Sequence, residues 1–303
     1  MISFRYHLVS IVAVFLALAL GVVVGTTVVN QGIVDDLRRR TNAAVENSDK
    51  LRSQIADLNS QLDASQTFEN IVMPILIKDQ LTGAEVLLMT QQDVSASDVD
   101  SVRRALTDAG ATVVSELVVT NRMGLGDKNS QADLATALGT PDSGVPDDLA
   151  KEAARAVAAR LANGPGVLPN DDLLSKLGSS GFLLTRGGSG PSAIGGTGQA
   201  VVLLSGTTRP AVDPALFMAP LAAALVEAQQ PVAAAETETA TAPFVPLLRD
   251  DGSVDGHLVT VDDADLTSGR VALVLGLRDL LATPGKGGDY GVKAGASALL
   301  PRP

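Results

Sequence analysis

Histidine, cysteine and serine most often carry nucleophilic and metal chemistry, and this chain of 303 residues has two histidines and no cysteine. A serine hydrolase needs a histidine base beside its nucleophile, yet the nucleophile elbow Gly-x-Ser-x-Gly does not occur in the sequence. His7 lies beside a long apolar run, so a triad can form only around His257. We therefore expect a protein that is not an enzyme, with a triad around His257 as the alternative.

Two glycine-dense strings, at residues 187–190 and 195–198, have the composition of loops that wrap phosphate groups. A phosphate loop joins a strand to a helix, whose first backbone amides bind the anion. These strings instead lead into an apolar segment at residues 200–204, and they lack both the Gly-x-Gly-x-x-Gly spacing and a Gly-Lys-Ser/Thr ending. The sequence favours a flexible surface connection, and we expect no bound cofactor.

Metal ligands of two kinds can be sought in the sequence. An acidic region near the C-terminus can offer oxygen ligands to Ca²⁺, although aspartates in loops after strands more often form caps and turns. Soft Cu(I) prefers cysteine and methionine sulfur, and the five methionines are far apart, with no Met-x-x-Met or His-x-x-Met pair. We therefore predict no metal site. The aspartates are Asp250, Asp251, Asp255, Asp262, Asp263 and Asp265, and the methionines are Met1, Met73, Met89, Met123 and Met218.

Composition narrows the class of protein. Apolar residues make up 46% of the chain, which is enough for a sizeable buried core, and only 3% of residues are aromatic. A formal net charge of −11 argues against a nucleic-acid surface, because binding a polyanion requires clustered Lys and Arg. We expect a folded protein with no nucleic-acid partner.

An uncharged apolar run at residues 8–29 is long enough to cross a membrane as a helix, which takes roughly 20 residues. The alternative is a cleaved signal peptide with Arg5 as its basic region and residues 17–19 as the cleavage site. The apolar character continues past that site, which favours an uncleaved anchor over residues 1–30. Small residues recur every fourth position on one face, which predicts a helix association face. They are Ala13, Ala17, Gly21 and Gly25.

Residues 31–73 have the pattern of a coiled-coil stalk. Neither Gly nor Pro occurs between Val34 and Val72, and apolar side chains repeat at positions three and four apart. The strongest part of this seam predicts an interface for self-association or for a partner helix; an amphipathic helix folded onto the globular domain is the alternative. Pro74 is expected to end the helix or kink it. The seam residues are Leu51, Ile55, Leu58 and Leu62.

Residues 74–303 predict a globular α/β domain with a Rossmann-like, open and mostly parallel sheet. An apolar strand at residues 85–90, a helix at 97–109 and a second strand at 111–119 form a βαβ unit, whose parallel strands need a helical crossover. The remaining pattern predicts loops at 140–146 and 237–246, helices at 131–138, 148–162, 171–177, 213–229 and 268–282, and strands at 181–185, 200–204, 231–235 and 258–261.

Strings at both ends of the chain resemble an actinobacterial family named after the mycobacterial copper transport protein MctB. The first is MISFRYHLVS at residues 1–10, followed by AVFLALALG at residues 13–21. The C-terminal strings are Val261-Asp262-Asp263, Gly269-Arg270, Gly288-Asp289-Tyr290-Gly291 and Leu299-Leu300-Pro301. The resemblance covers essentially the whole chain.

This resemblance implies two roles of different classes. One is copper efflux or copper homeostasis at the mycobacterial outer envelope, as a pore-forming transporter. The other, from the corynebacterial relative SteB, is control of a peptidoglycan hydrolase at cell division. A membrane barrel needs many alternating strands, whereas this chain offers a helical span and an α/β domain. The family pattern also has a histidine where this sequence has Asp289, which removes a further metal ligand.

We therefore expect a single-pass cell-envelope protein that works through protein–protein interaction. Its expected partners are a second copy of the chain, a partner protein bound by the coiled coil, or an envelope peptidoglycan hydrolase. Copper handling is the alternative function. Its orientation is ambiguous from charge, because Arg5 lies on one side of the span and Arg38 to Arg40 lie on the other. The resemblance implies a cytoplasmic N-terminus and an extracytoplasmic bulk, with an outer-membrane location as the alternative.

Overall fold

The computed structural model describes residues 4–141, 144–166, 171–188, 190, 193–206 and 209–302, with the backbone alone at residues 27–31. Its contacts divide the chain into two compact units, Met1–Phe68 and Glu69–Pro303. The helix α1, Phe4–Ile77, begins in the first unit and ends in the second. The division falls a few residues before Pro74, where the sequence predicted that the stalk would end.

Pro74 lies inside α1, and the helix continues to Ile77. The Lys78 amide still bonds to the Pro74 carbonyl at 3.1 Å, because a proline removes only its own donor and leaves its carbonyl available. Ile77 is fully buried and Met73 packs against the same apolar cluster. The last turn of α1 therefore belongs to the core of the second unit.

The second unit is built on one seven-stranded sheet in the order β3-β2-β1-β4-β5-β6-β7. All neighbouring strands pair in parallel except β3, which is antiparallel to β2. The fold class expected from the sequence is confirmed. The strands are β1 Glu85–Gln91, β2 Thr112–Val119, β3 Leu183–Arg186, β4 Ala200–Ser205, β5 Val232–Glu236, β6 Val259–Val261 and β7 Gly288–Tyr290.

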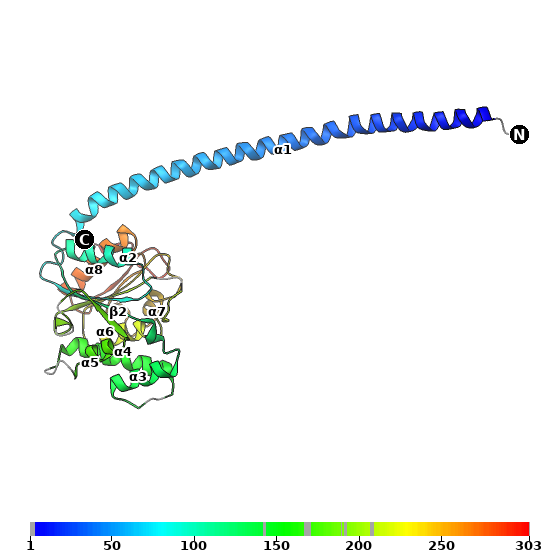
Figure 1. The fold of residues 1–303 in the computed structure, drawn as a ribbon. Coiled ribbons are helices and arrows are strands. Elements are labelled where there is room, and N and C mark those ends of the chain that lie inside the picture. The colour runs from blue at the N-terminus through cyan, green and yellow to red at the C-terminus, as the bar shows by residue number, and fades with distance from the viewer. Residues whose placement is uncertain are drawn as a thin grey trace. The chain divides into compact units, whose positions relative to one another are not determined.

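Helices cover both faces of this sheet, as expected for parallel strands joined by helical crossovers (Figure 1). Successive side chains of β1 alternate between two apolar clusters, one on each face of the sheet. Leu87 and Met89 belong to the cluster that includes side chains of the helices from α3 through α7. Val86 and Leu88 belong to the cluster that includes side chains of α2, α8 and the end of α1. The helices are α2 Ala96–Asp108, α3 Lys128–Leu138, α4 Pro146–Asn163, α5 Leu173–Ser179, α6 Met218–Glu227, α7 Val245–Arg249 and α8 Thr267–Ala282, with a short 3₁₀ helix at Asn121–Gly124.

Three features depart from the sequence-based expectation. The helix expected at residues 213–229 begins later, at Met218, because the Asp213 carboxylate accepts the Ala215 amide at 2.9 Å and holds a turn. The short helix α7 begins at the end of the loop expected at residues 237–246. Strand β7 was not expected, since only three residues form it and glycine contributes the first.

Candidate functional site

Within the described residues, one helical segment, Phe4–Thr26, is long and apolar enough to cross a membrane, and an 18-residue window of it has a mean hydropathy of 2.9. Ala13 and Ala17 are exposed along it, and Cβ atoms built on Gly21 and Gly25 would meet nothing within 4 Å. This face is therefore open in the single chain, as a helix association face requires. Association through these four residues stays a prediction.

The seam of the stalk is also uncovered. Leu51, Ile55, Leu58 and Leu62 are 58%, 57%, 62% and 55% exposed. In a helix these positions lie above one another on one face, so they form a continuous apolar stripe. A stripe of this kind needs a partner to leave water, and pairing through it stays a prediction.

The switch point of an open α/β sheet is the usual place for a ligand, at the carboxyl ends of the strands where the order reverses. Here it lies between β1 and β4, whose last residues are Gln91 and Ser205. Ser205 donates its hydroxyl proton to Gln91 Oε1 at 2.6 Å, and Gln91 Nε2 donates to the Val212 carbonyl at 2.7 Å. Both polar side chains are buried and satisfied by the protein itself.

A network of buried charges extends from there along the carboxyl ends of β5, β6 and β7. Arg249 Nη1 lies 2.6 Å from the Asp262 carboxylate, and both side chains are almost completely buried. Arg249 also donates to Thr260 Oγ1 at 2.8 Å, and Thr260 donates to Asp289 at 2.6 Å. Lys293 Nζ lies 2.8 Å from Glu236 Oε1. Every one of these charges faces an opposite charge or a hydrogen-bond partner.

Contacts in and around this network account for the residue types in three of the C-terminal strings, at residues 261–263, 269–270 and 288–291. The second oxygen of the Asp262 carboxylate accepts the amides of Val292 and Lys293 at 2.7 and 3.0 Å. Gly291 has a φ of +130°, and a Cβ on it would collide with that carboxylate. A Cβ on Gly269 would collide with Asp263 in the same way. These residue types therefore fix the C-terminal segment to the sheet.

Among the other aspartates of the acidic region, Asp251 makes the turn contact expected of it, whereas Asp265 bonds to a distant segment. Asp251 accepts the Ser253 amide at 3.0 Å, and Asp265 accepts the Glu238 amide at 2.6 Å. Asp263 accepts the Ser268 hydroxyl at 2.8 Å, but its Oδ1 has no hydrogen-bond partner. Burial raises the pKa of Asp263, the Ser268 hydroxyl opposes that rise, and the charges of Asp262 and Asp265 add to it.

The alternative of a triad around His257 finds no support in the contacts of its neighbours. His257 is exposed in the loop before β6. Ser253 is the closest serine to it in the sequence, and its hydroxyl donates to Asp251 at 2.7 Å instead of to the histidine. Among the described residues, no hydrogen bond joins a serine hydroxyl to His257.

The glycine-dense connection follows the surface of α4 and β2. Gly196 donates its amide to the Leu161 carbonyl at 2.7 Å, and Arg160 Nη1 donates to the Ile194 carbonyl at 2.8 Å. A Cβ on Gly188 would collide with the Val114 carbonyl, and one on Gly195 would meet the Leu161 carbonyl at 2.7 Å. Close backbone approach therefore accounts for these two glycines, and the two bonds hold Ile194 and Gly196 to α4. Residues 189, 191 and 192 of the connection lie outside the described residues, so its flexibility stays a prediction.

Metal ligands are sparse within the described part of the chain, where no group of three or more His, Cys, Asp or Glu side chains could hold an ion. The methionines are less scattered than the sequence suggested. Met89, Met123 and Met218 are fully buried in the same apolar cluster, and Met73 packs against the other. Their burial among aliphatic side chains is typical of methionine used to fill a core.

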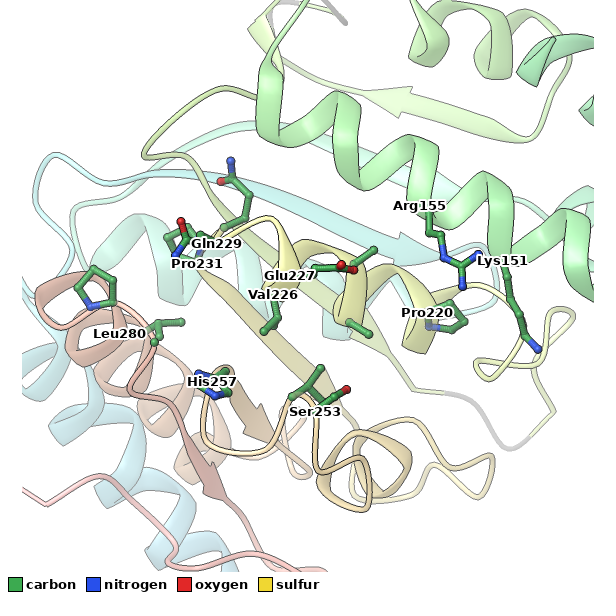
Figure 2. Close-up of a pocket in the computed structure, with 16 residues that line it drawn as sticks. Lys151, Arg155, Pro220, Val226, Glu227, Gln229, Pro231, Ser253, His257 and Leu280 are labelled. Carbon is green, nitrogen blue, oxygen red and sulfur yellow. The ribbon is translucent and has the colours of Figure 1, made fainter. Parts of the chain in front are cut away.

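A pocket of about 730 Å³ opens at the other edge of the sheet, near the amino ends of β5 and β6 (Figure 2). Lys151 and Arg155 of α4 line one side of it, and Ser253 and His257 line the other. Apolar side chains of α6 lie between them, and Leu280 at the end of α8 lies next to His257. Sequence reasoning missed this site because its residues come from four separate segments.

A protein-family model and several known proteins match this chain over almost its whole length. Residues 1–301 match the model of a family described as "Copper transport outer membrane protein, MctB". Proteins named "Copper transporter MctB" from Mycobacterium tuberculosis and Mycobacterium bovis are 28% identical, over 99% of this chain and 99% of their own. The protein of that name from Mycobacterium leprae is also 28% identical over the same shares.

Proposed function

Because the chain belongs to the MctB family, we propose that it serves copper homeostasis as a single-pass cell-envelope protein that works by binding other proteins. The observation that carries the copper role is the match to proteins named as copper transporters along 99% of both chains. Control of a peptidoglycan hydrolase at cell division, which the sequence favoured, has no counterpart in those names. It becomes the second candidate.

The proposal assigns copper handling to an assembly and not to a metal site in this chain. A tight Cu(I) site needs several soft ligands that converge and that the metal can reach. Met89, Met123 and Met218 are fully buried in the core, and the exposed His257 offers a single imidazole. This ligand supply supports a role as a partner or an anchor for other envelope proteins.

Two apolar stripes provide the means of assembly. The small-residue face around Gly21 and Gly25 allows helices to approach within the membrane, where packing drives association. The stripe from Leu51 to Leu62 suits a coiled coil outside the membrane. We propose that a second copy of the chain, or a helix of a partner protein, covers the stalk.

The N-terminus is proposed to lie in the cytoplasm and the α/β domain outside it. The family resemblance supports this orientation, whereas Arg38 to Arg40 oppose it by the positive-inside rule. An alkaline phosphatase fused after Pro303 is active only outside the cytoplasm, so we expect activity from that fusion. A fusion active only as a cytoplasmic reporter would reverse the orientation.

A deletion strain tests the copper role directly. We expect growth to become copper-sensitive and septation to stay normal, with both the wild-type chain and a variant carrying Met89→Leu and Met218→Leu restoring resistance. Crosslinking in cells should then recover other envelope proteins together with the chain. Normal copper resistance with defective septation would contradict the copper role and favour the division role.

A titration separates partner binding from direct metal binding. Residues 31–303, reduced and titrated with Cu(I) against a strong chelator, are expected to retain no stoichiometric copper. Retention that is lost in the Met89→Leu and Met218→Leu variant would instead identify a metal site in the core. That outcome would replace the partner mechanism with direct transport and leave the copper role standing.

A further inference from the structure

The pocket near the amino ends of β5 and β6 has the size and the lining of a ligand site. Its volume of about 730 Å³ falls within the roughly 300–1,000 Å³ of small-ligand pockets. Buried Leu280 and Val254 form part of its wall, and Ala223, Val226 and Pro231 add further apolar surface. The pocket lies at the edge opposite to the buried charges at the ends of β5 to β7. It therefore plays no part in that network.

Two cations without partners mark one end of this pocket. Lys151 and Arg155 are one turn apart on α4, both are exposed, and neither has an ion pair within the described residues. Arg160, farther along the same helix, forms a buried salt bridge with Asp172. Lys151 and Arg155 instead present their charges at the surface of the pocket, where an anionic ligand can reach them.

The charge of the lining favours a single carboxylate over a phosphate. Glu227 of α6 also lines the pocket, so the two cations and this anion leave one positive charge. Figure 2 shows Glu227 on α6, between Arg155 on one side and His257 on the other. A dianionic phosphate would meet too little positive charge and an added repulsion, whereas one carboxylate balances the site.

The other end of the pocket offers hydrogen-bonding groups of the kind that bind peptide amides. Ser253 and His257 are exposed there, Gln229 is exposed in the turn after α6, and each of the three can donate or accept a hydrogen bond. The apolar wall between the two ends is made mainly of small or flat side chains. Such a wall accommodates an extended backbone with short apolar side chains.

We propose that this pocket binds the C-terminal end of a peptide, with its free carboxylate held by Lys151 and Arg155. The apolar side chains of the peptide lie along α6, and its backbone amides reach Ser253 and His257. The site gives the α/β domain a means of recognising a partner peptide that is separate from the stalk. It stands on the pocket alone and does not depend on the copper role.

The test uses the full chain in lipid nanodiscs and an array of N-acetylated tetrapeptides with apolar residues at the first three positions. Each sequence is present as the free acid and as the C-terminal amide. We expect a subset of free acids to be retained, and the matching amides to bind at least about tenfold more weakly, because the charge-assisted hydrogen bonds are lost. Retention of no peptide, or equal retention of acids and amides, would overturn the proposal.

Variants then locate the binding. The free acid that binds best should lose at least about tenfold in affinity in the Lys151→Gln and Arg155→Gln double variant, as measured by fluorescence anisotropy. The control carries Lys78→Gln and Lys128→Gln, which remove the same charge from exposed positions outside the pocket, and it should bind as wild type. Equal binding by both variants, or displacement of the peptide by millimolar inorganic phosphate, would refute the assignment.

Discussion

Replacing Ile55 and Leu58 by Asp places two charges in the centre of the stalk seam. Full burial of such a side chain is worth roughly 1.5–3 kcal/mol. With 57% and 62% of the two side chains exposed in the single chain, pairing adds about 1–2 kcal/mol for each. The four side chains of two paired helices therefore contribute about 4–8 kcal/mol, which is lost before any repulsion between the new charges is counted. The dissociation constant should rise by about a thousandfold or more.

Sedimentation velocity of residues 31–303 measures this change. We expect an associated species for the wild type and a single chain for the double variant. The control carries Ser53→Asp and Ser60→Asp, which add the same charge on the opposite helix face and should leave the mass unchanged. If the Ile55 and Leu58 variant keeps the wild-type mass and the wild-type crosslinked partners, the seam is not an interface.

Two further predictions concern the buried charges. Arg249→Met leaves the Asp262 carboxylate buried without its partner, and it should lower the unfolding free energy by about 3–5 kcal/mol. The control Lys176→Met breaks an exposed ion pair and should lower it by about 1 kcal/mol or less. Chemical denaturation followed by circular dichroism measures both, since the chain has no tryptophan; equal costs would contradict the network. The pKa of Asp263 is raised in the folded state by burial. The folded state therefore loses stability as the pH rises above about 3.8, the pKa of the unfolded side chain, because ionisation is less favourable in the folded protein. Asp263→Asn should therefore gain stability relative to wild type between pH 4 and pH 7, and a difference that does not change with pH would show that Asp263 does not titrate in this way.

Local pattern predicted most of the elements because parallel strands and their crossover helices have long, distinct apolar periods. The βαβ unit at the start of the α/β domain is confirmed nearly to the residue, from Glu85 to Val119. The short elements α7, β7 and the 3₁₀ helix were missed because their residues carry no period of their own. Strand β7 exists because Asp262 and Arg249 bond to the backbone at Tyr290 and beyond it, which is a contact between distant segments.

The sequence by itself determined the apolar span, the stripe on the stalk and the α/β class, since each follows from the spacing of side chains along one helix or strand. Only the tertiary structure decided which polar residues meet. Asp262 was expected to form a cap or turn and is instead the buried partner of Arg249. Lys151, Arg155 and His257 line one pocket although α4, α6 and the loop before β6 are far apart in the chain. Such meetings depend on how strands are ordered in the sheet, and no local spacing encodes that order.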